Sequence, residues 1–128
     1  MISHDMEVKR GDVFYAELLQ DQIGSVQAGI RPVVIKQGNW LNRTSTTYGV
    51  ALITSRLKNT GMATHVLLPK LKGLPKQSMV LGEQQTTVDR KQLVSYRCTL
   101  PDETMKQVDR AIRCADSSKE HWHKKRKR

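Results

Sequence analysis

Cysteine and histidine are both scarce in this sequence, which limits the sites that it can build. The two cysteines, Cys98 and Cys114, are too few and too far apart for a disulfide framework or a zinc site. Three of the four histidines lie near the ends of the chain, namely His4, His121 and His123. The sequence therefore predicts reduced, packed thiols, with neither a metal site nor another cofactor.

Long apolar runs are missing as well. No stretch approaches the roughly 18 consecutive apolar residues that cross a bilayer, and the N-terminal segment MISHDMEVKRGD lacks the apolar core of a signal peptide. We therefore expect a soluble, cytoplasmic protein. The 128 residues have the length of one domain with a single core. We place this domain at 1–118, followed by a basic, disordered tail at 119–128.

Acidic residues are outnumbered, with 12 Asp and Glu against 22 Lys and Arg and a net charge of +10. The tail KEHWHKKRKR carries six of the basic residues and one Glu, and such a run by itself is most often a solvated end of the chain. The rest of the chain stays basic without it, which is more informative. This charge balance predicts a polyanionic partner, and nucleic acid is the first choice.

Short runs of β-branched and aromatic residues alternate with turn residues along most of the chain. No pattern of crossover helices separates them, so they predict an antiparallel arrangement. The expected strands are VFYAELL (13–19), RPVVIKQ (31–37), YGVALITS (48–55), THVLLP (64–69), the start of SMVLGEQQTTVDR (78–90) and SYRC (95–98). We therefore expect a mainly β (α+β) fold, a small antiparallel barrel with YGVALITS as its central strand.

One amphipathic helix is expected after the last strand. Thr99 can cap it, Pro101 falls in its first turn, and Asp102 and Glu103 favour the positive end of the helix dipole. Its apolar stripe is predicted at Met105, Val108, Ile112 and Ala115. We expect this stripe to pack on the barrel.

Three stretches of the sequence, taken in order, resemble one protein family. They are KRGDVFYAEL near the start, GSVQAGIRPVVI with VALITSRL in the middle, and EQQTTVDRKQL before the helix. They resemble the MazF/PemK (Kid) toxins of type II toxin–antitoxin modules over about residues 8–116. The resemblance implies a homodimeric, SH3-like barrel that cuts single-stranded RNA at short sequence motifs without metal. It also implies inhibition by a MazE-like antitoxin, whose acidic, partly disordered segment covers the RNA groove.

RNA cleavage by attack of the ribose 2′-hydroxyl needs a group that stabilises the charge developing on the phosphate. A guanidinium suits this task because its planar fork matches phosphate oxygens and keeps its charge. Arg31, held at a strand start by Pro32, is the best-placed arginine, and the resemblance gives it the catalytic role. The resemblance also places a catalytic hydroxyl at Thr54, which would donate to the scissile phosphate. Ser55 should point to the opposite face of the strand, so we expect it to contact RNA only.

The sequence departs from the family pattern at two positions that bear on proton transfer. Val26 stands where many relatives carry Glu, and Thr86 stands where some carry a second catalytic arginine. Loss of one proton-transfer group typically costs about 10²–10⁴-fold in rate. His65 and Asp89 are candidates for an acid or base. His65 could instead be a polar residue at a strand start, and Asp89 could close a turn, so the general base stays open here.

Sequence-selective binding of single-stranded RNA uses aromatic stacking and hydrogen bonds to base edges. Aromatics are few, with two Trp, three Tyr and one Phe, and Trp40 lies in the polar segment 38–47, which we expect to be a mobile loop. We expect this loop to line the RNA groove, with the alternative that Trp40 folds back to anchor its own loop. The other residues expected to bind RNA are Ser25, Gln27, Asn39, Asn42, Arg43, Gln84, Gln85 and Thr86.

Two other functions compete with the nuclease. The same barrel could act by protein contact, as the related CcdB toxins do when they poison DNA gyrase. It could also be an RNA-binding module that has lost cleavage, which Val26 and Thr86 keep open. The pairing of G-x-RPV with the ITS strand favours the nuclease.

Overall fold

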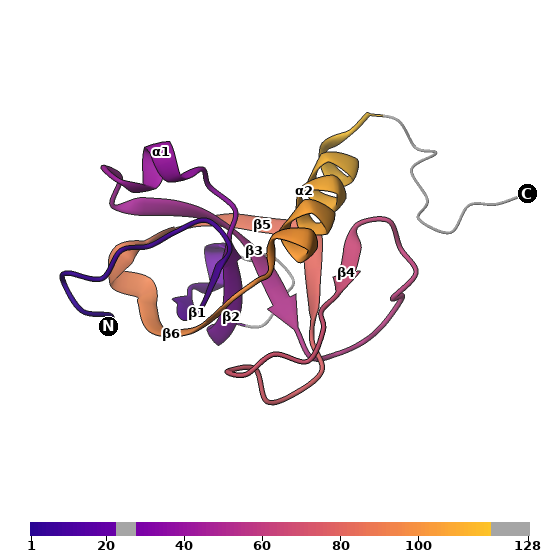
Figure 1. Cartoon of the computed structure of the whole chain (residues 1–128), viewed down its shortest axis with the longest axis horizontal. Coiled ribbons are helices and arrows are strands. Elements are labelled where there is room, and N and C mark those ends of the chain that lie inside the picture. Colours follow the sequence, from indigo (N-terminus) through magenta and orange to yellow (C-terminus); the bar gives the residue numbers. More distant parts are fainter. Residues whose placement is uncertain (23–27, 119–128) are drawn as a thin grey trace, which may run out of the picture.

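The computed structural model of this chain describes residues 1–22 and 28–118 (Figure 1). Its strands are β1 (Asp12–Leu18), β2 (Gly29–Ile35), β3 (Thr47–Thr54), β4 (His65–Leu67), β5 (Met79–Asp89) and β6 (Leu93–Thr99). Its helices are α1 (Asn39–Asn42), α2 (Asp102–Asp116) and the short 3-10 turns η1 (Gln20–Gln22) and η2 (Arg90–Gln92). The predicted tail at 119–128 lies outside the described residues. None of the helices in these two ranges has the length and apolar character to cross a membrane.

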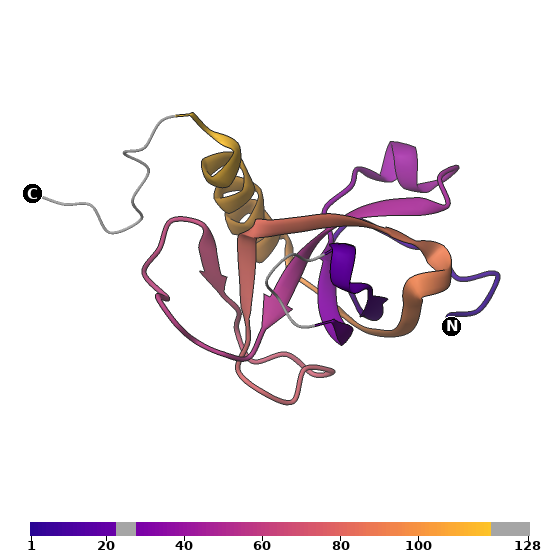
Figure 2. The same ribbon diagram turned by 180° about the vertical axis from the view of Figure 1, so that it is seen from behind.

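The strands form one antiparallel sheet in the order β4-β5-β3-β2-β1-β6. The prediction of a mainly β chain with a C-terminal helix is confirmed, and β3 lies inside the sheet as expected of the most apolar segment. The edges are β4 and β6, and in the described ranges no strand pairing joins them. The predicted closure into a barrel is therefore not shown by the pairing, although the sheet is strongly curved when seen from behind (Figure 2).

A large irregularity in β5 divides the sheet into two parts. Ala51 pairs with Gln85, but the next residue of β3, Leu52, pairs with Leu81, so three extra residues lie on β5. Such an insertion bends the strand that carries it. Gly82 lies within the insertion, and a Cβ there would be 2.8 Å from the Thr64 carbonyl oxygen and 3.1 Å from the backbone of Ala111 in α2. The bend thus depends on a residue without a side chain, and it brings α2 against β5 and β4.

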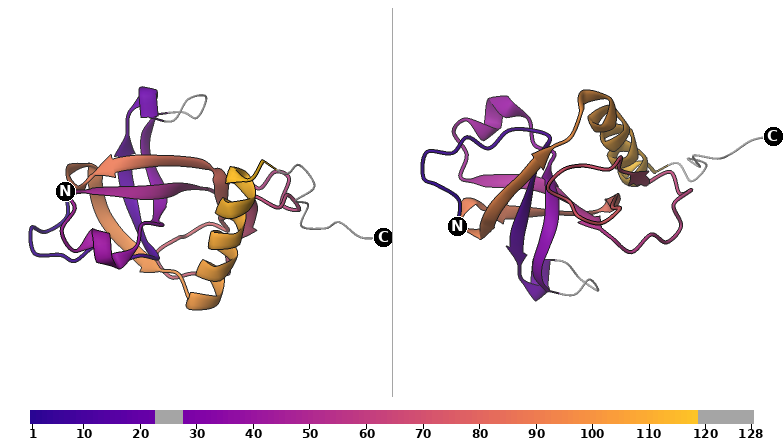
Figure 3. Two further views of the ribbon diagram at one scale, coloured as in Figure 1. Left: turned by 90° about the horizontal axis from the view of Figure 1, so that it is seen from above. Right: turned by 60° about the horizontal axis from the view of Figure 1, so that its bottom comes forward.

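Apolar residues fill both faces of the sheet, because successive side chains of a strand point to opposite faces. One face carries a cluster that we call the first core, which includes Phe14, Val33 and Leu52. The other face carries the second core, which includes Val34 and is covered by α2 (Figure 3). Burial on both faces explains why VVI and ALI are unbroken apolar runs.

The start of α2 differs from the prediction. Thr99 is the last residue of β6, where its hydroxyl donates to Asp12 Oδ1 at 2.8 Å, so it is not the helix cap. Pro101 occupies the cap position and provides no side-chain hydrogen bond. The buried residues of the helix are Thr104, Met105, Val108, Ala111 and Cys114, whereas the predicted Ile112 and Ala115 are only partly buried. The buried stripe therefore follows steps of three residues from Met105 to Cys114, and Ala111 within it lies next to Gly82 at the bend.

Neither cysteine forms a disulfide among the described residues; Cys114 is buried in α2 and Cys98 is partly buried in β6. Burial raises the pKa of the Cys98 thiol, while the Arg97 cation lowers it and the Asp12 carboxylate adds to the increase. A raised pKa keeps the thiol protonated at neutral pH and therefore a poor nucleophile.

Candidate active site

The pairing of β2 with β3 relates the two predicted catalytic residues. The paired residues are Val33 with Leu52, Val34 with Ala51, and Ile35 with Val50. Continuing this antiparallel register past Val33 places Arg31 opposite Thr54, on the face that carries the first core. The continued register therefore puts Arg31 and Thr54 on one face at the same end of the sheet, just beyond the last β2–β3 pair.

Arg31 is fixed on the β1 side of β2. It pairs with Ala16, and the following Pro32 pairs with Tyr15. Proline has no N–H to give to a neighbouring strand, and the β2–β3 pairing ends one residue later, at Val33. Arg31 is partly buried, whereas the preceding Ile30 is 57% exposed. The arginine thus lies where β2 and β3 part, at the rim of the first core.

Thr54 is the last residue of β3 and is partly buried. Its Oγ1 accepts a hydrogen bond of 3.0 Å from the backbone N–H of Arg56. A hydroxyl has one donor and two acceptor positions, so this bond fixes the oxygen and leaves its proton for another acceptor. Ser55 is exposed in the bend that follows, and Ser25 and Gln27 lie outside the described residues.

The structure does not bring His65 to Arg31 and Thr54. His65 is 5% exposed and bonds the Asn59 carbonyl oxygen at 2.9 Å and Glu83 Oε2 at 3.0 Å. It pairs with Leu81 of β5, so β5 separates it from β3. From the strand spacing, its Cα atom is roughly 12 Å from that of Thr54. In this structure it holds the turn after β3 against β5.

Asp89 also lies away from the pair. It caps η2, where its carboxylate accepts from Lys91 N at 2.9 Å and its N–H donates to Gln92 Oε1 at 2.8 Å. It pairs with Thr47 at the start of β3, roughly 23 Å from Thr54 along the strand. The turn-closing role considered for Asp89 is the one that the structure shows.

The α1 segment lies at the far end of the sheet. It joins the end of β2 to the start of β3, whereas Arg31 and Thr54 are at the other ends of these strands (Figure 1). The expected mobile loop contains a short helix, in which Asn42 is 7% exposed and its side-chain amide donates to the Gln37 carbonyl at 2.9 Å. Trp40 is 75% exposed, and the edge of its ring lies beside Gly38, where a Cβ would come within 3.1 Å of Cδ1 and Nε1.

The remaining polar residues of the segment divide between the fold and the surface. Asn39 Oδ1 accepts from the N–H of Arg10 at 2.7 Å and from Asn42 at 3.1 Å. Asn42 is thereby enclosed by hydrogen bonds within the protein, while Arg43 is exposed. Asn39 and Asn42 thus serve the fold of α1, and Trp40 and Arg43 present their side chains to solvent.

The β5 candidates lie beside or beyond the bend. Thr86 pairs with Val50, four residues and roughly 13 Å along β3 from Thr54, on the same face. The side-chain amide of Gln85 donates to the Gly82 carbonyl at 2.8 Å and to Asp116 at 3.2 Å. Gln84 is partly buried within the inserted residues. Gln85 therefore ties the bend to the end of α2.

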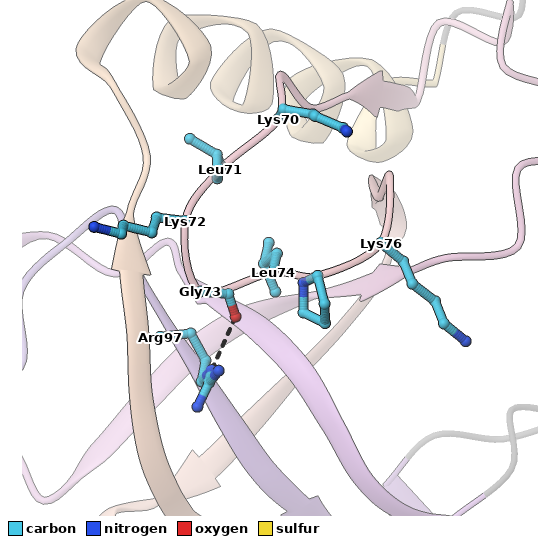
Figure 4. Close-up of a pocket in the computed structure, with 8 residues that line it drawn as sticks. Lys70, Leu71, Lys72, Gly73, Leu74, Lys76 and Arg97 are labelled. Carbon is cyan, nitrogen blue, oxygen red and sulfur yellow. Dashed lines mark hydrogen bonds between the residues drawn. The ribbon is translucent and has the colours of Figure 1, made fainter.

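One group of cations was missed by the sequence analysis. Lys70, Lys72 and Lys76, in the turn between β4 and β5, line a pocket together with Arg97 of β6 (Figure 4). The segment KLKGLPK does show three lysines in seven residues. Its contact with Arg97, more than twenty residues later, depends on the tertiary fold.

Comparison with known proteins gives a consistent family assignment. Residues 9–115 match the family described as the PemK-like, MazF-like toxins of type II toxin–antitoxin systems. The chain is 41% identical over 108 residues to the endoribonuclease EndoA of Bacillus subtilis strain 168, covering 84% of this chain and 92% of EndoA.

Solved structures agree in fold. MazF of Deinococcus radiodurans superposes with a TM-score of 0.72 at 22% identity, covering 86% of this chain and 96% of that one. A mycobacterial endoribonuclease in complex with its cognate antitoxin superposes with a TM-score of 0.71 at 21% identity, covering 87% and 96%. By sequence and by fold, this chain belongs to the PemK-like, MazF-like toxins of type II toxin–antitoxin systems.

Proposed function

We propose that this chain is an endoribonuclease toxin that cleaves single-stranded RNA at the end of the sheet where Arg31 lies opposite Thr54. The observation that supports the proposal is the β2–β3 register, which, continued past Val33, puts Arg31 and Thr54 on one face at the same end of the sheet. The 41% identity to a protein named an endoribonuclease supports the reaction class.

The proposed reaction is a transfer within the RNA backbone. The ribose 2′-oxygen attacks the adjacent phosphorus and loses its proton, a new P–O2′ bond forms, and the P–O5′ bond breaks. The products are a 2′,3′-cyclic phosphate and a 5′-oxygen that gains a proton, so no metal ion or cofactor is consumed. Arg31 stabilises the negative charge on the phosphoryl oxygens in the transition state. Thr54 donates its hydroxyl proton to one of the same oxygens.

The proton transfers are not assigned to His65 or Asp89. His65 is enclosed by Asn59 and Glu83, and Asp89 caps a turn at the other end of β3. The proposed chemistry therefore rests mainly on charge stabilisation by Arg31 and Thr54. This fits the sequence, in which Val26 and Thr86 replace two ionisable groups of the family pattern.

The same proposal extends to the assembly and its partners. We infer a homodimer in the cytoplasm that acts on mRNA and is inhibited by a MazE-like antitoxin, as the antitoxin complexes of similar structures suggest. The curved sheet would form an SH3-like barrel, residues 1–118 would be the toxin domain, and 119–128 would be a basic tail. The RNA contacts that we propose are Ser25, Gln27, Trp40, Arg43, Ser55, Gln84, Gln85 and Thr86, without the expected Asn39 and Asn42, whose side chains hold α1 together.

A second candidate is an RNA-binding protein that no longer cuts. The replacement of two ionisable family positions by Val26 and Thr86 favours it. It predicts tight RNA binding without new fragments, and this result separates it from the nuclease.

The test is incubation of the purified chain with a long single-stranded RNA in EDTA. We expect discrete fragments that end in 2′,3′-cyclic phosphate. Arg31→Ala should lower kcat/KM by about 10³-fold, because it removes the main charge stabilising the transition state. Arg31→Lys should recover part of this loss, since it keeps the charge but not the planar fork.

The matched control is Arg113→Ala, which removes an exposed arginine from the last turn of α2. Its kcat/KM should equal that of the unaltered chain. RNA binding without cleavage by the unaltered chain would establish the second candidate instead. Equal cleavage by Arg31→Ala and Arg113→Ala would contradict the role of Arg31.

A further inference from the structure

The turn between β4 and β5 and the end of β6 enclose what we call the basic groove (Figure 4). The groove has a volume of about 490 Å³ and is lined by Lys70, Leu71, Lys72, Gly73, Leu74, Pro75, Lys76 and Arg97. None of these lining residues carries a carboxylate. Across the described parts of the chain, its four cations form no ion pair. The three lysine side chains project from the turn in different directions (Figure 4), so the groove has cations around its rim and no carboxylate in its lining.

The turn that carries the lysines is held in one conformation. Gly73 has a φ of +99°, and a Cβ at this position would overlap the backbone carbonyl of Arg97. The N–H of Leu74 donates to the Leu71 carbonyl at 3.2 Å, and the Leu74 side chain is 8% exposed within the second core. The turn thus packs against both β6 and the second core. Because it is already ordered, less conformational entropy is lost when a ligand binds.

The guanidinium of Arg97 is held in one orientation by two contacts. Its Nε donates to the Gly73 carbonyl at 2.9 Å, and its guanidinium carbon lies 4.7 Å from the centre of the Tyr15 ring. The two terminal nitrogens have no acceptor among the described residues. They form the part of the guanidinium that binds two phosphate oxygens at once.

The basic groove lies at the same end of the sheet as the proposed active site, on the opposite face. Thr54 pairs with Met79, and Met79 pairs with Leu67, so the turn between Leu67 and Met79 leaves the sheet at the end where Thr54 lies. Tyr15, under Arg97, precedes Ala16, which pairs with Arg31. Because neighbouring residues of a strand face opposite ways, the groove and Arg31 lie on the two sides of the same end of the sheet.

We propose that the basic groove binds the phosphate backbone of the RNA substrate on one side of the cleaved bond. This inference rests on the proposed function, because it concerns the same RNA. Lysines and a fixed guanidinium bind phosphates irrespective of base, so the groove adds affinity and leaves the recognised sequence unchanged. An acidic protein segment is the competing occupant, but the oriented fork of Arg97 favours the paired oxygens of a phosphate, and phosphate is the group that we propose.

The test measures binding separately from cleavage. In the full chain carrying Arg31→Ala, the Kd for a fluorescein-labelled long single-stranded RNA is measured by anisotropy over a range of salt concentrations. The variant Lys70→Gln/Lys72→Gln/Lys76→Gln should bind about tenfold more weakly at low salt. The slope of log K against log salt should fall by roughly 2, since each phosphate contact on a single strand contributes about 0.7.

A matched control removes three other exposed lysines, Lys9→Gln/Lys91→Gln/Lys106→Gln, and so loses the same net charge. Its salt slope should stay that of the parent. A second variant, Gly73→Ala, keeps every cation but disrupts the turn, and it should also lower the slope. Its thermal unfolding curve establishes that it is folded.

Each outcome is decisive for the groove. Equal slopes for the groove variant and the control variant would overturn the proposal. Poly-glutamate of equal charge is also tested as a competitor. If it displaces RNA from the parent but not from the groove variant, the groove is a site for an acidic protein, and the proposal is overturned. If the predicted slopes are found but the unaltered chain never cuts RNA, the role of the groove in RNA binding stands and the proposed nuclease function is rejected.

Discussion

The two ends of strand β3 each have an arginine near a hydroxyl, in different surroundings. At one end, the β2–β3 register continued past Val33 puts Arg31 and Thr54 on the same face. At the other end, Arg90 of η2 donates to the Tyr48 hydroxyl at 3.3 Å and to the carbonyl oxygens of Ser3 at 2.8 Å and Met6 at 2.6 Å, and so ties the N-terminal segment to the sheet. An arginine near a hydroxyl can therefore be a purely structural contact, and activity measurements are what distinguish the proposed site from such a contact.

After the loss of about 10³-fold expected for Arg31→Ala, the largest effect in this comparison is expected at Thr54. Thr54→Val keeps the β-branched shape and removes the hydroxyl, so kcat/KM should fall by about 10²-fold with little change in stability. Thr54→Ser restores the hydroxyl and should recover most of the activity. Equal activity of the valine and serine variants, measured with one RNA substrate, would show that the hydroxyl takes no part in the reaction.

A change at His65 should affect stability more than cleavage. His65→Ala leaves Glu83 and the Asn59 carbonyl without their buried partner, which costs about 2 kcal/mol in the free energy of unfolding. Well below its melting temperature, the variant should cut RNA like the unaltered chain. Denaturant unfolding and cleavage assays on the same preparation test both statements, and a hundredfold loss of kcat/KM would restore His65 as an acid or base.

Asp89 offers a smaller effect of the same kind. Asp89→Ala removes the cap of η2 and should lower the free energy of unfolding by about 1 kcal/mol. Asp89→Asn keeps an acceptor for Lys91 N and should cost less. Urea unfolding measures the free energy of unfolding of the parent and of both variants. An alanine variant as stable as the parent would refute the capping role of Asp89.

The smallest effect is expected at the exposed Trp40. Because α1 lies at the far end of the strands, Trp40→Ala should change the cleavage of a short oligonucleotide less than that of a long RNA. Stacking of one base on an aromatic ring contributes about 1–3 kcal/mol, so any contact with the long RNA appears as a higher KM. A lower kcat on the short oligonucleotide would instead place Trp40 beside the cleaved bond.

Much of the fold could be predicted because strand formation is local. Alternating apolar residues and turn residues located most of the β-strands to within a few residues, as in the segment that became β3, but β5 runs to Asp89 where only the start of 78–90 was expected to be a strand. The order of the strands and the bend at Gly82 could not be predicted, because they depend on packing between distant segments. The cap at Thr99 was predicted wrongly for the same reason, since Asp12 of β1 takes its hydroxyl.

The candidate site divides in a similar way. Arg31 and Thr54 were recognised from short motifs, and the register explains why motifs distant in sequence lie together. The pattern alone could not separate them from His65 and Asp89, because burial and turn capping are visible only in the folded chain. The basic groove was missed because Gly73 and Arg97 meet only through the packing of the turn on β6.

The central claim is that Arg31 and Thr54 act on one phosphate. The measurement that tests it most directly is a double-mutant cycle on kcat/KM with Arg31→Ala, Thr54→Val and the double variant. Residues that act as a unit are not additive, so we predict that the double variant is barely slower than Arg31→Ala alone. Losses that simply multiply would contradict the account, because they would show that the two side chains act independently.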